Sequence, residues 1–240
     1  NEEVLGKMSE DILSPDLKIA FYGSGCTVEK IPVMQQILAD KFSLPLQNVE
    51  VAGDLLGAAR AVCGHESGIA CILGTGANSC LYDGKEITSN IPPLGYILGD
   101  EGSGAVLGKR FMNGIFKGWI PERIKTMYLE ETNQTYSNVI SKVYTQPLAN
   151  RYLATVSKFV GAHIEEKSLQ KLVKDNFSDF MKYNILPYNE IRKIGFVGSV
   201  ASVFSDILTE VCNKYGFEVS RIDQSPVAGL LDYYSKLNVK

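Results

Sequence analysis

The decisive stretch of the sequence reads Gly95-Tyr96-Ile97-Leu98-Gly99-Asp100-Glu101-Gly102-Ser103-Gly104. Two adjacent carboxylates lie here inside a glycine-rich turn, directly before a segment with a helical pattern, Ala105 to Phe116. Glycines let a backbone approach a ligand closely. A helix N-terminus offers N–H groups to an anion, and fixed carboxylates accept hydroxyl groups or a metal. The stretch therefore predicts a binding site for a polyol.

A second glycine turn lies upstream, where Gly74-Thr75-Gly76-Ala77-Asn78-Ser79 follows the apolar run Ile69 to Leu73. A strand that ends in Gly-Thr-Gly is suited to holding phosphate through backbone N–H groups. Taken alone, such a sequence is more often only a tight turn. Together, the two turns predict a kinase that acts on a small hydroxylated substrate.

Predicted strands alternate with predicted helices along the chain. The strands are Lys18 to Tyr22, Val49 to Ala52, Ile69 to Leu73, Ile194 to Val197 and Phe217 to Ile222, with a hairpin of Cys80 to Tyr82 and Lys85 to Thr88. The shorter helices are Asn1 to Leu13, Ile31 to Phe42, Leu55 to Val62 and Ala201 to Lys214. A long helical stretch runs from about Ser103 to Tyr183, with breaks near Pro121, Thr135 and Gly161. A last helix has Ser225 as its N-cap and Pro226 at its first position. This order predicts an α/β protein whose parallel strands are covered by helices.

The two halves of the chain repeat one order of elements, with one difference. The second half begins with three short strands that carry the Gly-Thr-Gly turn, and the first half begins without such strands. We expect that a segment of about 50 residues is missing before the first residue, judged from typical strand and loop lengths. A compact protein that never had those strands is the alternative.

Composition excludes several classes of protein. The chain has 240 residues, 45% of them apolar, and a net charge of −3, which gives no bulk attraction to nucleic acid or to an anionic membrane. No apolar run approaches the roughly 20 residues that span a bilayer. The five cysteines form no C-x-x-C pair, which favours reduced thiols in the cytoplasm over disulfides or zinc. An iron–sulfur cluster shared across a dimer stays open.

Four motifs in series resemble those of the N-acetylglucosamine kinases. They are Val51-Ala52-Gly53-Asp54-Leu55-Leu56-Gly57-Ala58-Ala59, Ile72-Leu73-Gly74-Thr75-Gly76, Gly99-Asp100-Glu101-Gly102-Ser103 and Phe196-Val197-Gly198-Ser199-Val200-Ala201. The series is also similar to the wider family of benzoyl-CoA reductase-activating ATPases, and both groups belong to the actin-like superfamily of sugar kinases and heat-shock chaperones. The likeness spans almost the whole chain.

The resemblance implies an actin-like, ribonuclease H-like ATPase fold of two lobes. The first lobe would comprise residues 1–67 and 226–240, and the second residues 68–225 with a helical insert at 103–190. It also implies ATP and Mg²⁺ as cofactors, although no metal ligand can be assigned. The family's first phosphate hairpin, which helps to hold magnesium, has no counterpart before the strand that begins at Lys18. A chain without that hairpin is expected to bind ATP poorly.

Residue roles follow from the same resemblance. Asp54, at a strand-to-helix junction, is implied as the general base, and simple helix N-capping is the alternative. Gly74, Thr75 and Gly76 would hold the ATP phosphates. The turn of Gly198, Ser199 and Ala201 would face the adenosine end, unless its small residues serve only close packing.

Substrate contacts are expected from Asn78, Gly95, Asp100 and Ser24. Asp100 is implied as the contact to sugar hydroxyls, and Ser24 ends the matching strand of the first half. Asn78 as a plain turn residue is nearly as well supported. The chain has Ala77 where many relatives carry serine, which removes one hydroxyl contact.

The leading hypothesis is therefore ATP-dependent phosphorylation of N-acetylglucosamine or a related amino sugar. Two alternatives are an ATPase that activates a dehydratase or reductase by electron transfer, and a non-catalytic sugar or nucleotide sensor. We expect a cytoplasmic protein without nucleic-acid or membrane partners. The sequence leaves the oligomeric state of the protein open, with a homodimer as the assembly considered.

Overall fold

The computed structural model describes residues 17–189 and 191–237. The predicted helix Asn1 to Leu13 lies outside these residues. The chain divides into two compact units, Asn1–Gly57 and Ala58–Lys240. The predicted lobes of residues 1–67 with 226–240 and of residues 68–225 stay a prediction.

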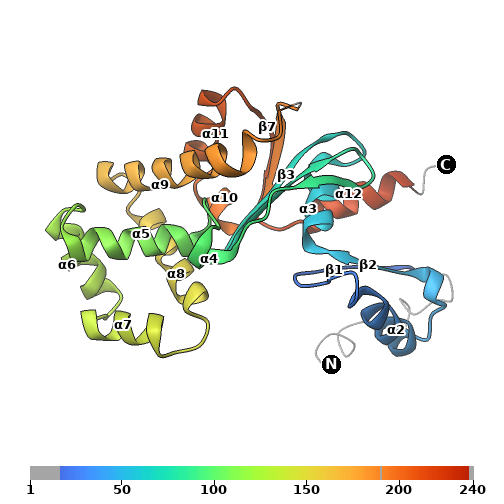
Figure 1. The fold of residues 1–240 in the computed structure, drawn as a ribbon, viewed down its shortest axis with the longest axis horizontal. Helices are drawn as coiled ribbons and strands as arrows, with labels where there is room; N and C mark the ends of the chain where they lie inside the picture. The colour runs from blue at the N-terminus through green and yellow to red at the C-terminus, as the bar shows by residue number, and fades with distance from the viewer. Residues whose placement is uncertain (1–16, 190, 238–240) are drawn as a thin grey trace. The chain divides into compact units, whose positions relative to one another are not determined.

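The first unit holds a two-stranded parallel sheet (Figure 1). Its strands are β1 (Ile19–Gly23) and β2 (Val49–Gly53), with α2 (Ile31–Phe42) and the short helix η2 (Leu46–Asn48) between them in sequence. Ala39 of α2 is buried with Val49 and Val51 of β2, so the helix covers one face of the pair. Gly23 lies opposite Gly53, so both strands end at the same edge.

The second unit is built on a five-stranded sheet with the order β5-β4-β3-β6-β7. The strands are β3 (Gly68–Leu73), β4 (Ala77–Tyr82), β5 (Ile87–Asn90), β6 (Lys193–Val197) and β7 (Glu218–Asp223). β4 pairs antiparallel with both β3 and β5, whereas β3 pairs parallel with β6 and β6 with β7. The α/β class, the three short strands and the later parallel strands were all predicted and are confirmed.

Helices from before and after the insert flank this sheet. They include α3 (Asp54–Cys63), α10 (Ser199–Val203), α11 (Ser205–Lys214) and α12 (Val227–Leu237). The single helix expected over Ala201 to Lys214 is wrong, because the chain breaks at Phe204 between α10 and α11. α12 crosses α3 closely, since a Cβ on Gly229 would lie 2.3 Å from the carbonyl oxygen of Ala61.

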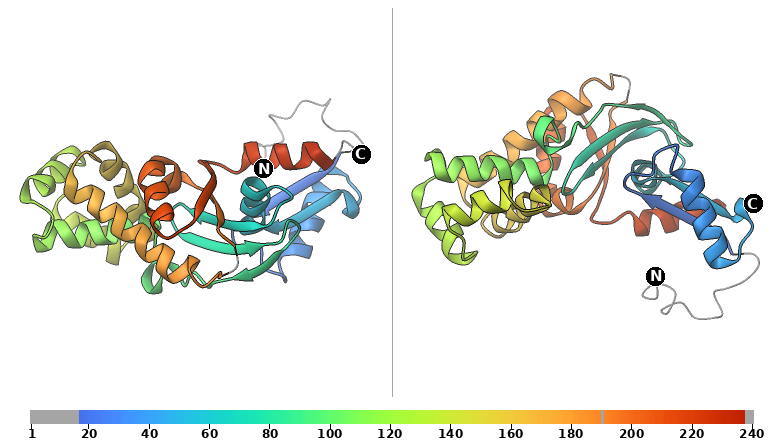
Figure 2. Two further views of the ribbon diagram at one scale, coloured as in Figure 1. Left: turned by 90° about the horizontal axis from the view of Figure 1, so that it is seen from above. Right: turned by 60° about the horizontal axis from the view of Figure 1, so that its bottom comes forward.

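A helical insert separates β5 from β6. It comprises α4 (Gly95–Leu98), α5 (Gly104–Lys117), α6 (Glu122–Glu131), α7 (Tyr136–Tyr144), α8 (Ala149–Ala162), α9 (Lys167–Phe180) and the π-helical turn η3 (Met181–Ile185). Figures 1 and 2 show α5 to α8 gathered beyond one end of the sheet. The breaks predicted near Pro121, Thr135 and Gly161 are confirmed. A further break between α7 and α8 was missed, although Pro147 there cannot continue a helix.

The core of the second unit runs without interruption from the sheet into the insert. α5 and α8 approach closely, because a Cβ on Gly108 would lie 2.0 Å from the carbonyl oxygen of Leu153. Phe111, Tyr128 and Phe159 pack edge to face beside that crossing. The insert is therefore part of the same packed body as the sheet that carries the candidate site.

Within the described residues, no helix is long and apolar enough to span a bilayer.

Candidate functional site

The Gly-Thr-Gly turn lies between β3 and β4, with its carbonyl groups held by the start of α5. Gly104 N–H donates to the carbonyl oxygen of Gly74 at 2.8 Å, and Ala105 N–H donates to that of Thr75 at 3.1 Å. Within the described part of the chain, the N–H groups of Thr75 and Gly76 donate no hydrogen bond. Nothing lies within 4 Å of a Cβ placed on Gly74. The turn thus offers two amide donors and open space, which fits a phosphate group.

The N-terminus of α5 was expected to offer its own N–H groups to an anion, and this expectation is wrong. Its first two N–H groups bind the Gly-Thr-Gly turn. Val106 N–H donates to the capping hydroxyl of Ser103 at 3.1 Å, and Leu107 N–H donates to the Ser103 carbonyl at 3.0 Å. Ser103 and Gly104 are also buried. The helix end therefore fixes the turn and leaves ligand binding to the turn's own amides.

Asp100 is held in an unusual backbone conformation beside the same turn. Its φ is 55°, in the left-handed region, and only 9% of the residue is exposed. The backbone N–H groups of Ala77 and Gly95 lie close enough to lower the pKa of its carboxyl, and Oδ2 lies 3.0 Å from the Cβ position of Gly76. Burial raises the pKa of this carboxyl, the Glu101 charge adds to the rise, and the two backbone donors oppose it. Left-handed backbone at a non-glycine residue is concentrated at functional sites.

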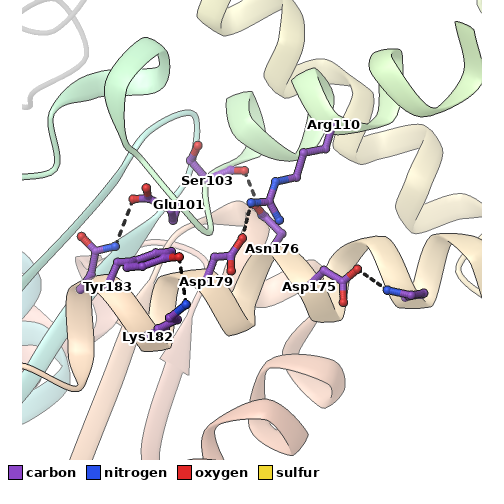
Figure 3. Close-up of polar contacts among 10 residues, drawn as sticks. Glu101, Ser103, Arg110, Asp175, Asn176, Asp179, Lys182 and Tyr183 are labelled. Atoms are coloured by element: carbon purple, nitrogen blue, oxygen red, sulfur yellow. Dashed lines mark hydrogen bonds and ion pairs between the residues drawn. The ribbon is translucent and has the colours of Figure 1, made fainter. Parts of the chain in front are cut away.

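The π-helical turn η3 and the end of α9 contact the loop that carries Asp100 and Glu101. Asn184 Nδ2 donates to Glu101 Oε2 at 3.2 Å, a bond that is drawn as the dashed line from Glu101 in Figure 3. A Cβ on Gly102 would lie 2.9 Å from Cβ of Phe180, so the loop backbone lies directly on the end of α9. Glu101 precedes α5, which begins at Gly104, and is held by a side chain of η3. π-turns occur often at functional sites.

α9 also supports the N-cap of α5. Asn176 Nδ2 donates to the Ser103 carbonyl at 3.3 Å, and Arg110 of α5 pairs with Asp179 of α9 (Figure 3). Asn176 is fully buried. Because α5 in turn fixes the Gly-Thr-Gly turn, the insert has a direct structural connection to the candidate phosphate site.

The Gly198 turn adjoins the Gly-Thr-Gly turn. Gly198 has a φ of 131°, and a Cβ there would lie 2.2 Å from the carbonyl oxygen of Leu73, the last residue of β3. Its N–H donates to the carbonyl oxygen of Asp223 at the end of β7, at 2.8 Å. The predicted nucleotide turns thus meet at the carboxyl ends of adjacent strands. Ala201 is fully buried in the core, so the packing alternative holds for its side chain, and Ser199 begins α10.

Asp54 and Ser24 both lie in the first unit, directly after the paired strand ends Gly53 and Gly23. Ser24 is exposed and Asp54 is half-buried as the first residue of α3. Asp54 lies in the first turn of α3, a position compatible with both the general-base role and the capping alternative. A Cβ on Gly57 would lie 2.7 Å from Cγ of Tyr22, which explains the glycine three residues into the helix. The functional roles of Asp54 and Ser24 stay predictions.

Three polar residues near the site were missed from the sequence: Asn90, Asn184 and Tyr188. Asn78 itself lies in β4, opposite Ile72 of β3, so it is a strand residue and not a turn residue. Asn90 of β5 and buried Tyr188 both bond the carbonyl oxygen of Ser79, the residue after Asn78. Isolated Asn and Tyr residues carry no spacing signal, so nothing in the sequence pointed to them.

Two further features bear on ligands. Among the described residues, no group of three or more His, Cys, Asp or Glu side chains is arranged to hold a metal ion. A cavity of about 740 Å³ lies between α4, α5, α7 and α8, and apolar side chains such as Met112 and Phe116 dominate its lining. None of its lining residues is a predicted site residue, although Tyr96 and Ile97 belong to the stretch that leads to Asp100.

Comparisons with known proteins were made with the sequence and with the fold. No family model matches the sequence, and no curated protein matches it. Among solved structures, one from Porphyromonas gingivalis, described as a "Putative N-acetylglucosamine Kinase", is 42% identical with a TM-score of 0.90. That alignment covers 99% of this chain and 83% of the other.

A second structure, from Chromobacterium violaceum and described in the same words, is 17% identical with a TM-score of 0.64. It covers 97% of this chain and 80% of the other, and at this identity it supports the fold alone. Both structures confirm the predicted actin-like α/β fold. On the identity to the Porphyromonas gingivalis protein, the chain belongs to the N-acetylglucosamine kinase-like family.

Proposed function

We propose that this protein is an ATP-dependent kinase that phosphorylates a hydroxyl of N-acetylglucosamine or a related amino sugar. The observation that carries the proposal is the pairing of two complementary groups in one small region. The Gly-Thr-Gly turn offers unused amide donors, and the buried Asp100 carboxylate lies against its last glycine. Amide donors suit the phosphates of ATP, and a carboxylate suits the hydroxyls of a sugar.

The phosphates would be held by the N–H groups of Thr75 and Gly76, with Gly74 leaving room for them. ATP supplies the transferable phosphoryl group. Mg²⁺ neutralises phosphate charge, and it commonly binds through phosphates and water with only one or two carboxylates. No protein ligand for it is assigned here, because the described residues hold no cluster of metal-binding side chains.

Asp54 would accept the proton of the attacking hydroxyl. The sugar oxygen then forms a bond to the γ-phosphorus, and the bond from that phosphorus to the bridging β,γ-oxygen breaks. The products are a sugar phosphate and ADP, with the proton on Asp54. Asp100 would orient the sugar through hydroxyl hydrogen bonds, and positioning of this kind supplies much of the rate in phosphoryl transfer.

The electron-transfer ATPase has no observation in its favour. Burial raises the pKa of Cys63 to about 11 and the pKa values of Cys80 and Cys212 to about 12. Burial likewise raises the pKa of Cys71 well above its usual value. Cys71, Cys80 and Cys212 are buried, whereas a cluster shared between two subunits needs cysteines at the surface. The free cysteines suit a reducing compartment, and we propose a cytoplasmic location.

The proposal is tested with the full-length protein in a coupled ADP-release assay over a panel of sugars. ADP release that requires N-acetylglucosamine or another amino sugar supports the kinase. Sugar binding without turnover would indicate a sensor. A brown protein whose visible absorbance depends on iron would indicate the electron-transfer ATPase.

A further inference from the structure

The side-chain amide of Asn78 has a single orientation in this fold. Ser79 N–H donates to Asn78 Oδ1 at 2.9 Å, and Asn90 Nδ2 donates to the same oxygen at 2.9 Å. A backbone N–H is only a donor, so the Asn78 atom that faces it must be the oxygen. The other end of the amide, Nδ2, therefore points away from Ser79 N and Asn90.

The orientation of Asn90 is equally determined. Its Nδ2, which donates one hydrogen to Asn78, donates the other to the carbonyl oxygen of Ser79 at 2.6 Å, with the carbonyl oxygen of Ile91 farther away at 3.3 Å. Carbonyl oxygens only accept hydrogen bonds, so the nitrogen of Asn90 must lie on this side. Asn90 is thus a donor to Asn78 and cannot be an acceptor from it.

Asn90 is held in place by a buried neighbour. The hydroxyl of Tyr188 accepts Ile91 N–H at 2.9 Å and donates to the Ser79 carbonyl at 3.0 Å. Tyr188 is 4% exposed, and Asn90 lies opposite Cys80 in the pairing of β5 with β4. The Tyr188 hydroxyl therefore links Ile91, directly after β5, to Ser79 of β4. Because these residues are the neighbours of Asn90 and Asn78, the link holds the two asparagines at a fixed distance from each other.

We propose that Asn90 is a positioning residue that turns the Asn78 amide so that its two N–H donors face the substrate. The inference rests on the proposed kinase function. Within the described residues, Asn78 Nδ2 donates to no protein atom. Asp100 Oδ2 lies 3.0 Å from the position that a Cβ on Gly76 would take, two residues before Asn78. The site thus presents donors from Asn78, the second residue of β4, and an acceptor from Asp100, which lies against Gly76 directly before β4.

The Asn78 donors and the Asp100 acceptor together determine which substrates can bind. The substrate must offer an acceptor oxygen to Asn78 and a hydroxyl hydrogen to Asp100. A sugar with a free hydroxyl next to a hydroxyl or carbonyl oxygen meets both demands. A sugar that carries a cationic amine at the Asn78 position is disfavoured, because two N–H donors would face it.

The test compares Asn90→Ala with Asn78→Ala and with the double variant in the full-length protein. Asn90→Ala is expected to raise the KM for the sugar about 3- to 10-fold, the effect of about one neutral hydrogen bond, with the KM for ATP unchanged. In the Asn78→Ala background the same change should have no further effect, because Asn90 acts only through Asn78. Ser89→Ala, at an exposed neighbouring position of β5, is the matched control and should change neither constant.

A second readout does not depend on activity. The Asn78 side-chain amide signal in a ¹H–¹⁵N spectrum, assigned by its loss in Asn78→Ala, should shift in Asn90→Ala and stay unchanged in Ser89→Ala. An unchanged Asn78 signal in Asn90→Ala would overturn the proposal. So would an Asn90→Ala effect on KM of equal size with and without Asn78. If the parent protein turned over no sugar, the proposed function would fail, and the spectrum alone would decide the positioning role.

Discussion

Replacing Gly198 by alanine is expected to destabilise the second unit severely. Gly198 has φ 131° and ψ 158°, a region that essentially only glycine adopts, at a cost of about 1–3 kcal/mol for another residue. The new Cβ would lie 2.2 Å from the Leu73 carbonyl oxygen and 2.6 Å from its carbon. Overpacking of this kind costs a further 1–3 kcal/mol or so. The expected loss is about 3 kcal/mol, or roughly a 100-fold change in the unfolding equilibrium.

The control is Gly216→Ala. Gly216 also has a positive φ, 79°, but nothing lies within 4 Å of its Cβ position. Only the left-handed backbone then opposes the alanine, which costs about 1 kcal/mol. Both glycines follow elements of the same unit, so the difference between the variants isolates the contact with Leu73.

Urea unfolding measures this difference. Trp119 is the only tryptophan and lies between α5 and α6, so its fluorescence reports on the second unit, and far-UV circular dichroism reports on both units together. Gly198→Ala should unfold at clearly lower urea than Gly216→Ala. If it unfolded at the same or higher urea, the close contact between the Gly198 turn and the end of β3 would be refuted.

Three further predictions concern the chemistry, and initial rates of ADP release measure each of them. Gly74→Ala should leave folding within about 1 kcal/mol of the parent, because its Cβ position is open, yet raise the KM for ATP; an unchanged KM would remove the phosphate role of the turn. Asp54→Asn should lower kcat by ~10²- to 10⁴-fold with little effect on the sugar KM, whereas Asp100→Asn should raise the sugar KM. Equal losses of kcat in both variants would contradict this division of roles. The parent's sugar KM should rise as pH falls through the Asp100 pKa, which burial raises above 3.8, since the carboxylate that accepts the hydroxyl is then protonated. In Asp100→Asn that rise should be absent, and its persistence would assign it to another group.

The sequence predicted the parts of the site that depend on glycine. Both Gly198 and Gly74 follow the end of a strand; the backbone at Gly198 admits only glycine, and Gly74 leaves open space beside its turn. The alternation of strands and helices likewise predicted the parallel part of the sheet, because apolar runs between turn residues carry that information locally. Asp100 was singled out by its glycine neighbours, and it is indeed buried beside Gly76.

What could not be predicted depends on contacts between distant segments. Asn184 reaches Glu101 from 83 positions away, and Tyr188 reaches Ser79 from 109 positions away. No local pattern marks either residue. The same holds for the N-terminus of α5, whose N–H groups looked available in sequence and are used by the carbonyls of Gly74 and Thr75. The break at Phe204 left no glycine or proline as a signal.

The central claim is that the protein transfers a phosphoryl group from ATP to a sugar hydroxyl. The most direct measurement incubates the full-length protein with N-acetylglucosamine and ATP labelled with ¹⁸O in its γ-phosphate, and follows the products by mass spectrometry. The account predicts a labelled sugar monophosphate formed in equal amount to ADP, and its near loss in Asp54→Asn. Label found only in inorganic phosphate, with no amino sugar carrying it, would contradict the account.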